Sequence, residues 1–219
     1  MQDIDTIIFD FDGTLAKTYP IIFFSFQSIF KEYNKQRVTP EQIIRMFGPP
    51  EQEIIKHQFR DQKDVTSIIE RYHHLYRTYH NQLVKPDSSI TRMLKVLTKR
   101  GYLLAIVTGK GRYSLDISLD QLWSDPYFAA TIAGDEVETP KPHPEGILKA
   151  LTLMDKSPQH SVYVGDSIID YQAGKAAGVR TFGVRWFDTN DDESWQEVQP
   201  DFRIDSTDEF LSLFPGPAL

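Results

Sequence analysis

The sequence contains no cysteine. Disulfide bonds, thiolate metal sites and a cysteine nucleophile are therefore excluded, and the composition fits a reducing compartment. No stretch approaches the roughly 18 consecutive apolar residues that indicate a membrane-spanning helix. The amino-terminal residues MQDIDT are acidic, whereas the corresponding region of a signal peptide is basic. We expect a soluble, cytoplasmic protein without a membrane partner.

Runs of lysine or arginine are also absent, and the formal net charge is −7. A nucleic-acid-binding domain usually carries a basic face, so nucleic acid is not an expected partner. An acidic chain that binds an anionic substrate needs a metal ion or a few well-placed cations. The 219 residues, of which 40% are hydrophobic, suffice for one large domain or for one domain with an insertion.

Short apolar runs separated by helical patterns predict an α/β fold. Apolar residues recur at three- and four-residue spacing between most of the later runs, as expected of helices that pack on a sheet. This alternation predicts a parallel sheet covered on both faces, with its active site at the carboxyl ends of the strands. The predicted strands are Thr6–Phe9, Leu103–Val107, Ala129–Ala133, Ser161–Val164 and Arg180–Val184.

Residues 17–86 interrupt this rhythm with a helical segment. Apolar positions predict one amphipathic helix over residues 22–33 and another over 65–79. Between them, a capping box begins at Thr39 and is followed by proline at the first helical position, so a further helix is expected to start there and to stop at Gly48. We predict a helical insertion between the first and second strands.

Two aspartates, Asp10 and Asp12, follow the first strand and precede a glycine turn. Acids beside a buried strand are costly unless a cation, a shared proton or a reaction explains them. The two-residue offset brings both carboxyl groups towards one pocket while Phe11 points elsewhere. One carboxylate can attack phosphorus and the other can transfer protons. A simple turn cap is the alternative for an isolated pair.

Polar residues follow the second strand as well. Thr108 offers a hydroxyl and Gly109 an open backbone N–H, and both suit a phosphoryl oxygen. A threonine that caps a turn is the alternative.

Lys141 lies in a stretch that contains three prolines, Thr139-Pro140-Lys141-Pro142-His143-Pro144. The prolines restrict the backbone, so this loop can aim a cation at a phosphate. A solvated surface lysine is the alternative.

An acidic pair follows the strand that ends near Val164. Asp166 comes directly after a glycine, and Asp170 falls in the first turn of a helix that starts at Ser167. Such carboxylates suit Mg²⁺, which prefers oxygen ligands. Helix capping by Asp166 is the alternative. Because parallel strands end at one edge, we expect all these groups to converge, which capping alone does not predict.

The motifs DFDGTL, VTGK, KPHP and GDSIID together resemble those of the haloacid dehalogenase-like hydrolase superfamily, in its phosphatase branch. They occur in the family's order and cover nearly the whole chain. The resemblance implies a three-layer Rossmann-like core with a small all-helical cap domain inserted after the first strand. The core would comprise residues 1–16 and 87–219, and the cap residues 17–86.

The resemblance also implies a role for each matched residue. Asp10 would be the nucleophile and a magnesium ligand, and Asp12 the general acid and base, with its backbone carbonyl also on the metal. Thr108 and Lys141 would hold the phosphoryl group. Asp166 would bind Mg²⁺ directly, and Asp170 would support it through water or hydrogen bonds.

One position departs from the family pattern. Many relatives carry asparagine or serine after the threonine, where this chain has Gly109. That difference removes a side-chain contact near the phosphate. We expect the nearby Lys110 and Arg112 to be solvated rather than to replace this contact.

The resemblance is strongest to phosphoglycolate phosphatases and to pyrophosphatases with a helical cap. It implies a small phosphorylated metabolite as the substrate and a monomer or homodimer. The stretch Phe47-Gly48-Pro49-Pro50-Glu51 resembles a cap loop that reaches the site. Arg45, just before it, can meet a substrate carboxylate or a second phosphate, or it can be an ordinary exposed arginine.

Three other functions are consistent with the same scaffold. A sugar phosphomutase shares this core, and the release of free phosphate would distinguish a phosphatase from it. Dehalogenases of the family lack an acid two residues after the nucleophile, so Asp12 argues against that activity. A non-catalytic binding protein would usually have lost a catalytic acid, and none is lost here.

Overall fold

The computed structural model describes residues 1, 3–187 and 198–216. Within these residues the strands form one six-stranded sheet in the order β3-β2-β1-β4-β5-β6, and every neighbouring pair is parallel. The predicted α/β fold is confirmed. The strands are β1 (Thr6–Phe9), β2 (Leu103–Val107), β3 (Phe128–Ile132), β4 (Ser161–Gly165), β5 (Arg180–Val184) and β6 (Phe202–Ile204).

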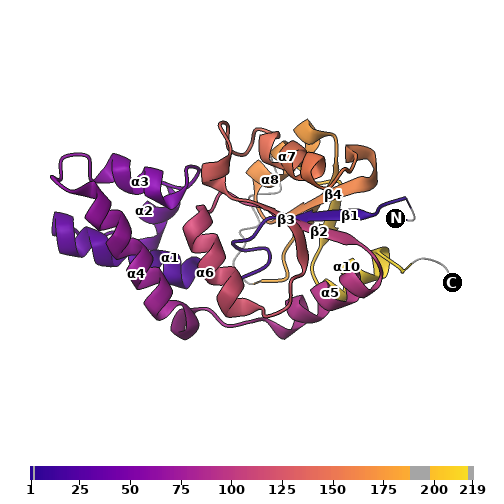
Figure 1. Ribbon diagram of the computed structural model, residues 1–219, viewed down its shortest axis with the longest axis horizontal. Helices are drawn as coiled ribbons and strands as arrows, with labels where there is room; N and C mark the ends of the chain where they lie inside the picture. Colours follow the sequence, from indigo (N-terminus) through magenta and orange to yellow (C-terminus); the bar gives the residue numbers. More distant parts are fainter. Residues whose placement is uncertain (2, 188–197, 217–219) are drawn as a thin grey trace.

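Helices cover both faces of the sheet, so the core has three layers (Figure 1). Helices α5 and α10 lie on one face, and α7 and α8 lie on the other. The core helices are α5 (Ser88–Lys99), α6 (Arg112–Leu122), α7 (Glu145–Leu153), α8 (Ile168–Ala177) and α10 (Thr207–Leu213), with short 3₁₀ turns at Gly134–Glu136 and Pro158–His160.

The alternation of side chains along β1 explains the three layers. All four residues of this central strand are buried. Ile7 and Phe9 belong to the hydrophobic cluster that contains α5 and α10, whereas Ile8 belongs to the cluster that contains α7 and α8. Successive side chains of a strand point to opposite faces, so an uninterrupted apolar run is what a doubly covered strand requires.

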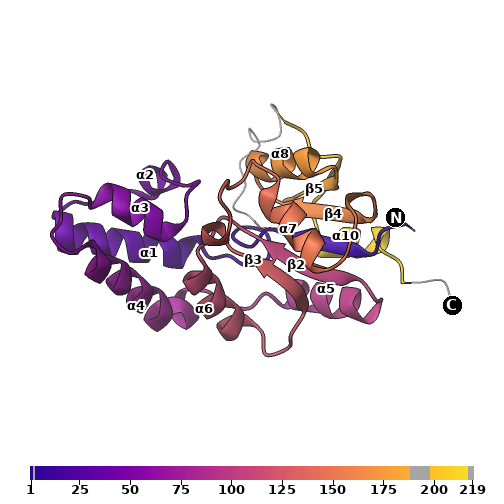
Figure 2. The same cartoon turned by 45° about the horizontal axis from the view of Figure 1, so that its top comes forward.

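The segment between β1 and α5 is entirely helical where it is regular. Figures 1 and 2 place its helices to one side of the sheet, beyond the carboxyl end of β1. This arrangement confirms the predicted helical cap inserted after the first strand. Its elements are α1 (Tyr19–Ile29), a π-helical turn (Phe30–Asn34), α2 (Pro40–Ile44), α3 (Glu51–Gln58) and α4 (Val65–Leu83).

The middle of the cap differs from the sequence prediction. The capping box at Thr39 is present, with Gln42 as its reciprocal partner, but α2 ends at Ile44 rather than at Gly48. Gly48 instead lies in the following loop at φ +134°, a conformation that favours glycine. Helix α3 then begins after Pro50 and was not predicted, because its eight residues carry little apolar periodicity.

The strand predictions are accurate to within about one residue for β1 to β5, and β6 is an addition. It has three residues, two of them exposed, and lies at the edge of the sheet. Phe202 stacks on Phe182 of β5 with ring centroids 4.7 Å apart.

Across the described residues, no helix combines the length and the apolar character that a bilayer crossing would require.

A buried polar contact joins the cap to the core. On α4, the Tyr76 hydroxyl and the His80 Nε2 lie 2.9 Å and 3.0 Å from the Ser118 hydroxyl of α6. The His80 side chain is fully buried and its Nδ1 has no hydrogen-bond partner within the described structure. Burial, with the nearby charge of Lys110, lowers the pKa of His80 to about 4.

This pKa predicts a specific loss of stability in acid. Between pH 6.5 and about 4 the unfolded chain binds a proton at His80 and the folded chain does not, so the free energy of unfolding falls as the pH is lowered. The contribution is about 3 kcal/mol. In urea unfolding series, His80→Gln should flatten this part of the pH profile. His74→Gln, at an exposed position of the same helix, should not.

Candidate active site

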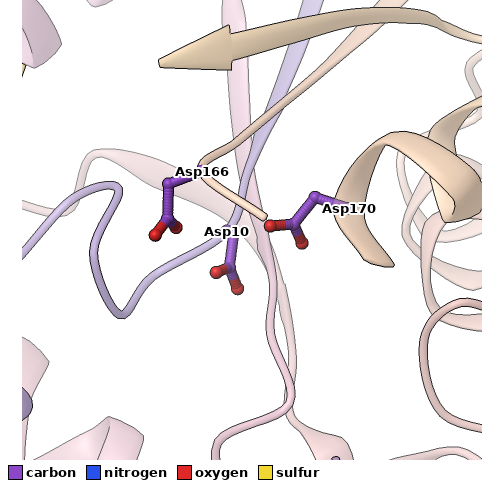
Figure 3. Close-up of side chains that lie close together, drawn as sticks. All are labelled: Asp10, Asp166 and Asp170. Carbon is purple, nitrogen blue, oxygen red and sulfur yellow. The ribbon is translucent and has the colours of Figure 1, made fainter. Parts of the chain in front are cut away.

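Three buried aspartates meet at the carboxyl edge of the sheet (Figure 3). Asp10 follows β1, Asp166 follows the neighbouring strand β4, and Asp170 lies in the first turn of α8. One carboxylate oxygen from each lies within 4.8 Å of the others. The strand order therefore brings together three acids that are far apart in the sequence.

Two glycines leave the space that these acids occupy. A Cβ atom on Gly13, which has φ +81°, would lie 2.4 Å from Oδ2 of Asp166. A Cβ atom on Gly165 would lie 2.4 Å from the Cβ atom of Asp170. Real Cβ atoms do not approach other atoms so closely, so the glycine beside each acid is a steric requirement of the site.

Helix capping and the acidic site coexist at the start of α8. Ser167, not Asp166, is the N-cap residue, and its reciprocal partner is Asp170. Oδ2 of Asp170 accepts hydrogen bonds from the Ser167 backbone N–H at 3.0 Å and from its hydroxyl at 2.5 Å. Asp166 is instead held by the Thr14 hydroxyl, which donates to Oδ1 at 2.8 Å.

Lys141 places a buried ammonium group among the acids. Its Nζ donates to Oδ1 of Asp10 at 2.8 Å and to Oδ1 of Asp170 at 2.6 Å. It also lies 3.2 Å from the hydroxyl of Tyr163, which itself donates to the Val107 carbonyl at 2.7 Å. The structure thus turns the proline-rich loop inward, towards the end of β1.

One lysine does not neutralise three carboxylates. Burial, reinforced by the charge of Asp170, raises the pKa of Asp10 to about 6, although Lys141 opposes this change. Burial and the charges of Asp170 and Asp10 also raise the pKa of Asp166 well above its usual value. Burial disfavours the ammonium form of Lys141, yet Asp10 and Asp170 raise its pKa and keep it charged.

This set of donors fits a metal ion. The three carboxylates are buried, mutually close and in excess over the cation beside them. Hard oxygen ligands are those that divalent cations such as Mg²⁺ prefer, and such an ion would remove the excess negative charge. Asp10 and Asp166 are the residues that would hold it, with Asp170 in support.

Asp12 forms a second charged group on the same side of the sheet. Its carboxylate accepts hydrogen bonds from the Thr18 hydroxyl and from Nζ of Lys110, which lies 3.1 Å from Oδ1 and 3.3 Å from Oδ2. The intervening Phe11 is fully buried and packs edge-on against Trp123, 6.3 Å away between ring centroids. Asp10 and Asp12 therefore face one cavity and Phe11 faces the core.

Lys110 is a site residue that the sequence analysis assigned wrongly to solvent. Its side chain is fully buried, with Nζ 3.5 Å from Oε1 of Glu51 and 4.8 Å from the ring centroid of Tyr76. Burial disfavours its charge, but Asp12 and Glu51 raise the pKa of Lys110 above its usual value. Oε2 of Glu51 also accepts a 2.6 Å hydrogen bond from the Gly111 backbone N–H.

Arg112 was also expected to be solvated, but it is only partly exposed and makes several contacts within the core. Its guanidinium lies 2.5 Å from Oε2 of Glu136, and it donates to the hydroxyl and the carbonyl of Thr131 at 3.0 and 2.8 Å. It fixes the start of α6 to the end of β3. Arg112 also pairs with Asp116, four residues along α6 at 3.1 Å. No signal in the sequence indicated the burial of Lys110 or the contact of Arg112 with β3, because Asp12 and Thr131 lie 98 and 19 positions away from them.

The remaining predicted residues divide into two groups. Thr108, which is buried, Gly109 and the cap loop residue Gly48 line the same cavity as Asp10. Arg45 is the C-cap residue of α2; it is exposed and is not among the residues that line the cavity.

The cavity lies between the cap and the carboxyl edge of the sheet and has a volume of about 660 Å³. Asp10, Asp12, Lys110, Lys141 and Asp166 form its charged floor. Sites of this size bury a small ligand almost completely. The arrangement places three carboxylates and two ammonium groups on the floor of one cavity, where a single small ligand can meet them all.

Known proteins resemble this chain in sequence and in fold. Pyrophosphatase PpaX of Anoxybacillus flavithermus is 34% identical over 212 residues, 97% of each chain, and PpaX of Bacillus pumilus is 32% identical over 96% of each chain.

Two solved structures show the same fold at lower identity. One, described as a predicted phosphoglycolate phosphatase from Haemophilus somnus, has a TM-score of 0.85 at 21% identity and covers 98% of this chain and 100% of its own. CbbY of Rhodobacter sphaeroides in complex with phosphate has a TM-score of 0.81 at 24% identity, over 94% and 96%. The sequence profile of haloacid dehalogenase-like hydrolases matches residues 7–184. The chain therefore belongs to the haloacid dehalogenase-like hydrolase family.

Proposed function

We propose that this hydrolase is a magnesium-dependent phosphatase that releases phosphate from a small phosphorylated metabolite through an aspartyl-phosphate intermediate. The observation that supports this proposal most directly is the position of Asp10. Its carboxylate lies on the floor of the cavity, 2.8 Å from Nζ of Lys141 and beside Asp166 and Asp170. The names of its relatives and the motif resemblance make pyrophosphate and phosphoglycolate-like esters the first substrates to assay.

In the first step a carboxylate oxygen of Asp10 attacks phosphorus. A phosphorus–oxygen bond forms to Asp10, the bond to the leaving oxygen breaks, and Asp12 donates a proton to that oxygen. Lys141 and Thr108 hold the phosphoryl oxygens as their charge shifts. Asp12 is suited to proton transfer because it lines the same cavity while Thr18 and Lys110 fix its carboxylate.

In the second step water regenerates the enzyme. Asp12 accepts a proton from the water molecule, the water oxygen bonds to phosphorus, and the bond from phosphorus to Asp10 breaks. Inorganic phosphate leaves, and both aspartates return to their starting state. When bound, Mg²⁺ would offset the repulsion between the carboxylates and the phosphate and orient the phosphoryl group.

We also propose residues 1–16 and 87–219 as the catalytic core and residues 17–86 as the cap.

Removal of the nucleophile tests the reaction. Asp10→Asn should lower phosphate release from a generic aryl phosphate by about 1000-fold or more, because the amide does not attack phosphorus. Circular dichroism and thermal unfolding should show an intact fold. Asp120→Asn, on the exposed side of α6, is the matched control and should retain activity. Near-normal turnover by Asp10→Asn would contradict the assignment of Asp10 as the nucleophile.

Removal of the metal tests the second part of the proposal. Excess chelator should abolish phosphate release, and added Mg²⁺ should restore it. Because a ligand that binds only the folded chain stabilises it, Mg²⁺ should also raise the unfolding temperature. Asp166→Asn should reduce that rise. Activity that persists in excess chelator would contradict the metal requirement.

Lys110 is proposed to position Asp12 for proton transfer. Lys110→Met removes the cation from the half-buried carboxylate of Asp12 and the buried carboxylate of Glu51 and should lower the free energy of unfolding by about 3 kcal/mol. It should also lower kcat more than it raises KM. Adding Glu51→Gln to Lys110→Met should recover part of the stability, since it removes one unpaired charge.

The control for this series is Lys56→Met. Lys56 forms an exposed ion pair with Glu53 on α3, and such pairs contribute little to stability. If Lys110→Met had no larger effect than Lys56→Met on stability and on kcat, the role assigned to Lys110 would be wrong.

A further inference from the structure

We infer that the substrate of this site is a phosphomonoester whose leaving group is apolar and carries no negative charge. This inference rests on the phosphatase proposed above and concerns the part of the substrate beyond the phosphoryl group. It follows from the chemistry of the cavity wall that the cap supplies.

Both lysines that line the cavity already form ion pairs with neighbouring carboxylates. Lys141 pairs with Asp10 and Asp170, and Lys110 pairs with Asp12 and Glu51. No lysine or arginine of the cap is among the described residues that line the cavity. Glu51 is the charged residue that the cap contributes to the lining, and its charge is negative.

Helix α1 supplies an aromatic and aliphatic wall. Tyr19, Ile22, Phe23 and Phe26 line the cavity from this helix. The Tyr19 ring stacks on Phe23 with centroids 5.8 Å apart, and on the other side it stacks on Phe47 at 6.2 Å with an interplanar angle of 13°. Burial and the charge of Asp166 raise the pKa of Tyr19, so its hydroxyl is neutral.

Three side chains on the rim are unusually exposed for their type. Ile44, Phe47 and Ile169 are 50%, 37% and 38% exposed, and all three line this cavity. Ile44 and Phe47 come from the cap and Ile169 from α8, on the opposite wall. Apolar side chains that line a cavity and remain exposed to solvent mark a surface that an apolar ligand covers.

This wall discriminates by charge. A carboxylate or a second phosphate placed against it would lose water, gain no cation and approach Glu51, so its burial would be costly. An apolar leaving group would instead bury against the rings. Pyrophosphate and phosphoglycolate both carry a second anionic group beyond the scissile bond, so this wall disfavours the two candidates that the relatives' names and the motifs put first for assay. Arg45, the cap cation considered for such a group, is exposed and outside the lining.

A matched pair of substrates tests the inference. Benzyl phosphate and 4-carboxybenzyl phosphate share the same ester linkage and differ by one distant carboxylate. With Mg²⁺, kcat/KM for phosphate release should be about tenfold or more higher for benzyl phosphate. Benzyl phosphate should also exceed phosphoglycolate and pyrophosphate. Equal or faster turnover of the charged compounds would overturn the inference and leave the phosphatase proposal intact, whereas no release from any compound would refute the phosphatase.

A charge placed on the wall provides a second, independent measurement. Ile44→Arg introduces a cation at an exposed rim position and should reduce the preference for benzyl over 4-carboxybenzyl phosphate. Leu153→Arg is the matched control, because Leu153 is 66% exposed on α7 and does not line the cavity. It should leave the ratio unchanged. An unchanged ratio in Ile44→Arg would count against the apolar wall as the selective element.

Discussion

Two buried ammonium groups hold four carboxylates at the carboxyl edge of the sheet, and a fifth lies beside them. Lys141 contacts Asp10 and Asp170, with Asp166 alongside, and Lys110 contacts Asp12 and Glu51. Such a cluster is costly unless every charge has a partner, so the surrounding structure is constrained to supply one. Three features bring the charges together. β1 and β4 are neighbours in the sheet, glycines leave space beside the acids, and the Lys141 loop turns inward.

The two lysines separate two chemical roles. Lys141 contacts groups of the core alone, around the proposed nucleophile. Lys110 connects Asp12 with Glu51 and packs on Tyr76, so the residue proposed to move protons is joined to two helices of the cap. The position of the cap and the proposed geometry of proton transfer thus depend on the same ion pairs of Lys110. The proposed nucleophile Asp10 is instead held by Lys141.

Sequence reasoning succeeded where local pattern carries the information. The apolar run of β1 and the capping box at Thr39 each have a local physical cause, and the structure contains both. Lys110 could not be assigned, because its burial depends on Asp12 and Glu51, which are distant in sequence. Helix α3 and strand β6 were missed because they are short and weakly patterned, and their positions are set by packing against the rest of the fold.

The connectivity of the cap has a further consequence. Helices α1 to α4 form one uninterrupted stretch of chain, which leaves the core after β1 and re-enters it before α5. Most of the apolar wall lies on this stretch, and the charged floor lies on core loops at the carboxyl edge of the sheet. The residues proposed to select the substrate therefore lie mostly in one contiguous segment, and the residues proposed to react with it lie in the two segments that flank it. The cap segment can diverge, or can be exchanged between homologues, while the core segments stay unchanged, provided that the partners of Lys110 are kept.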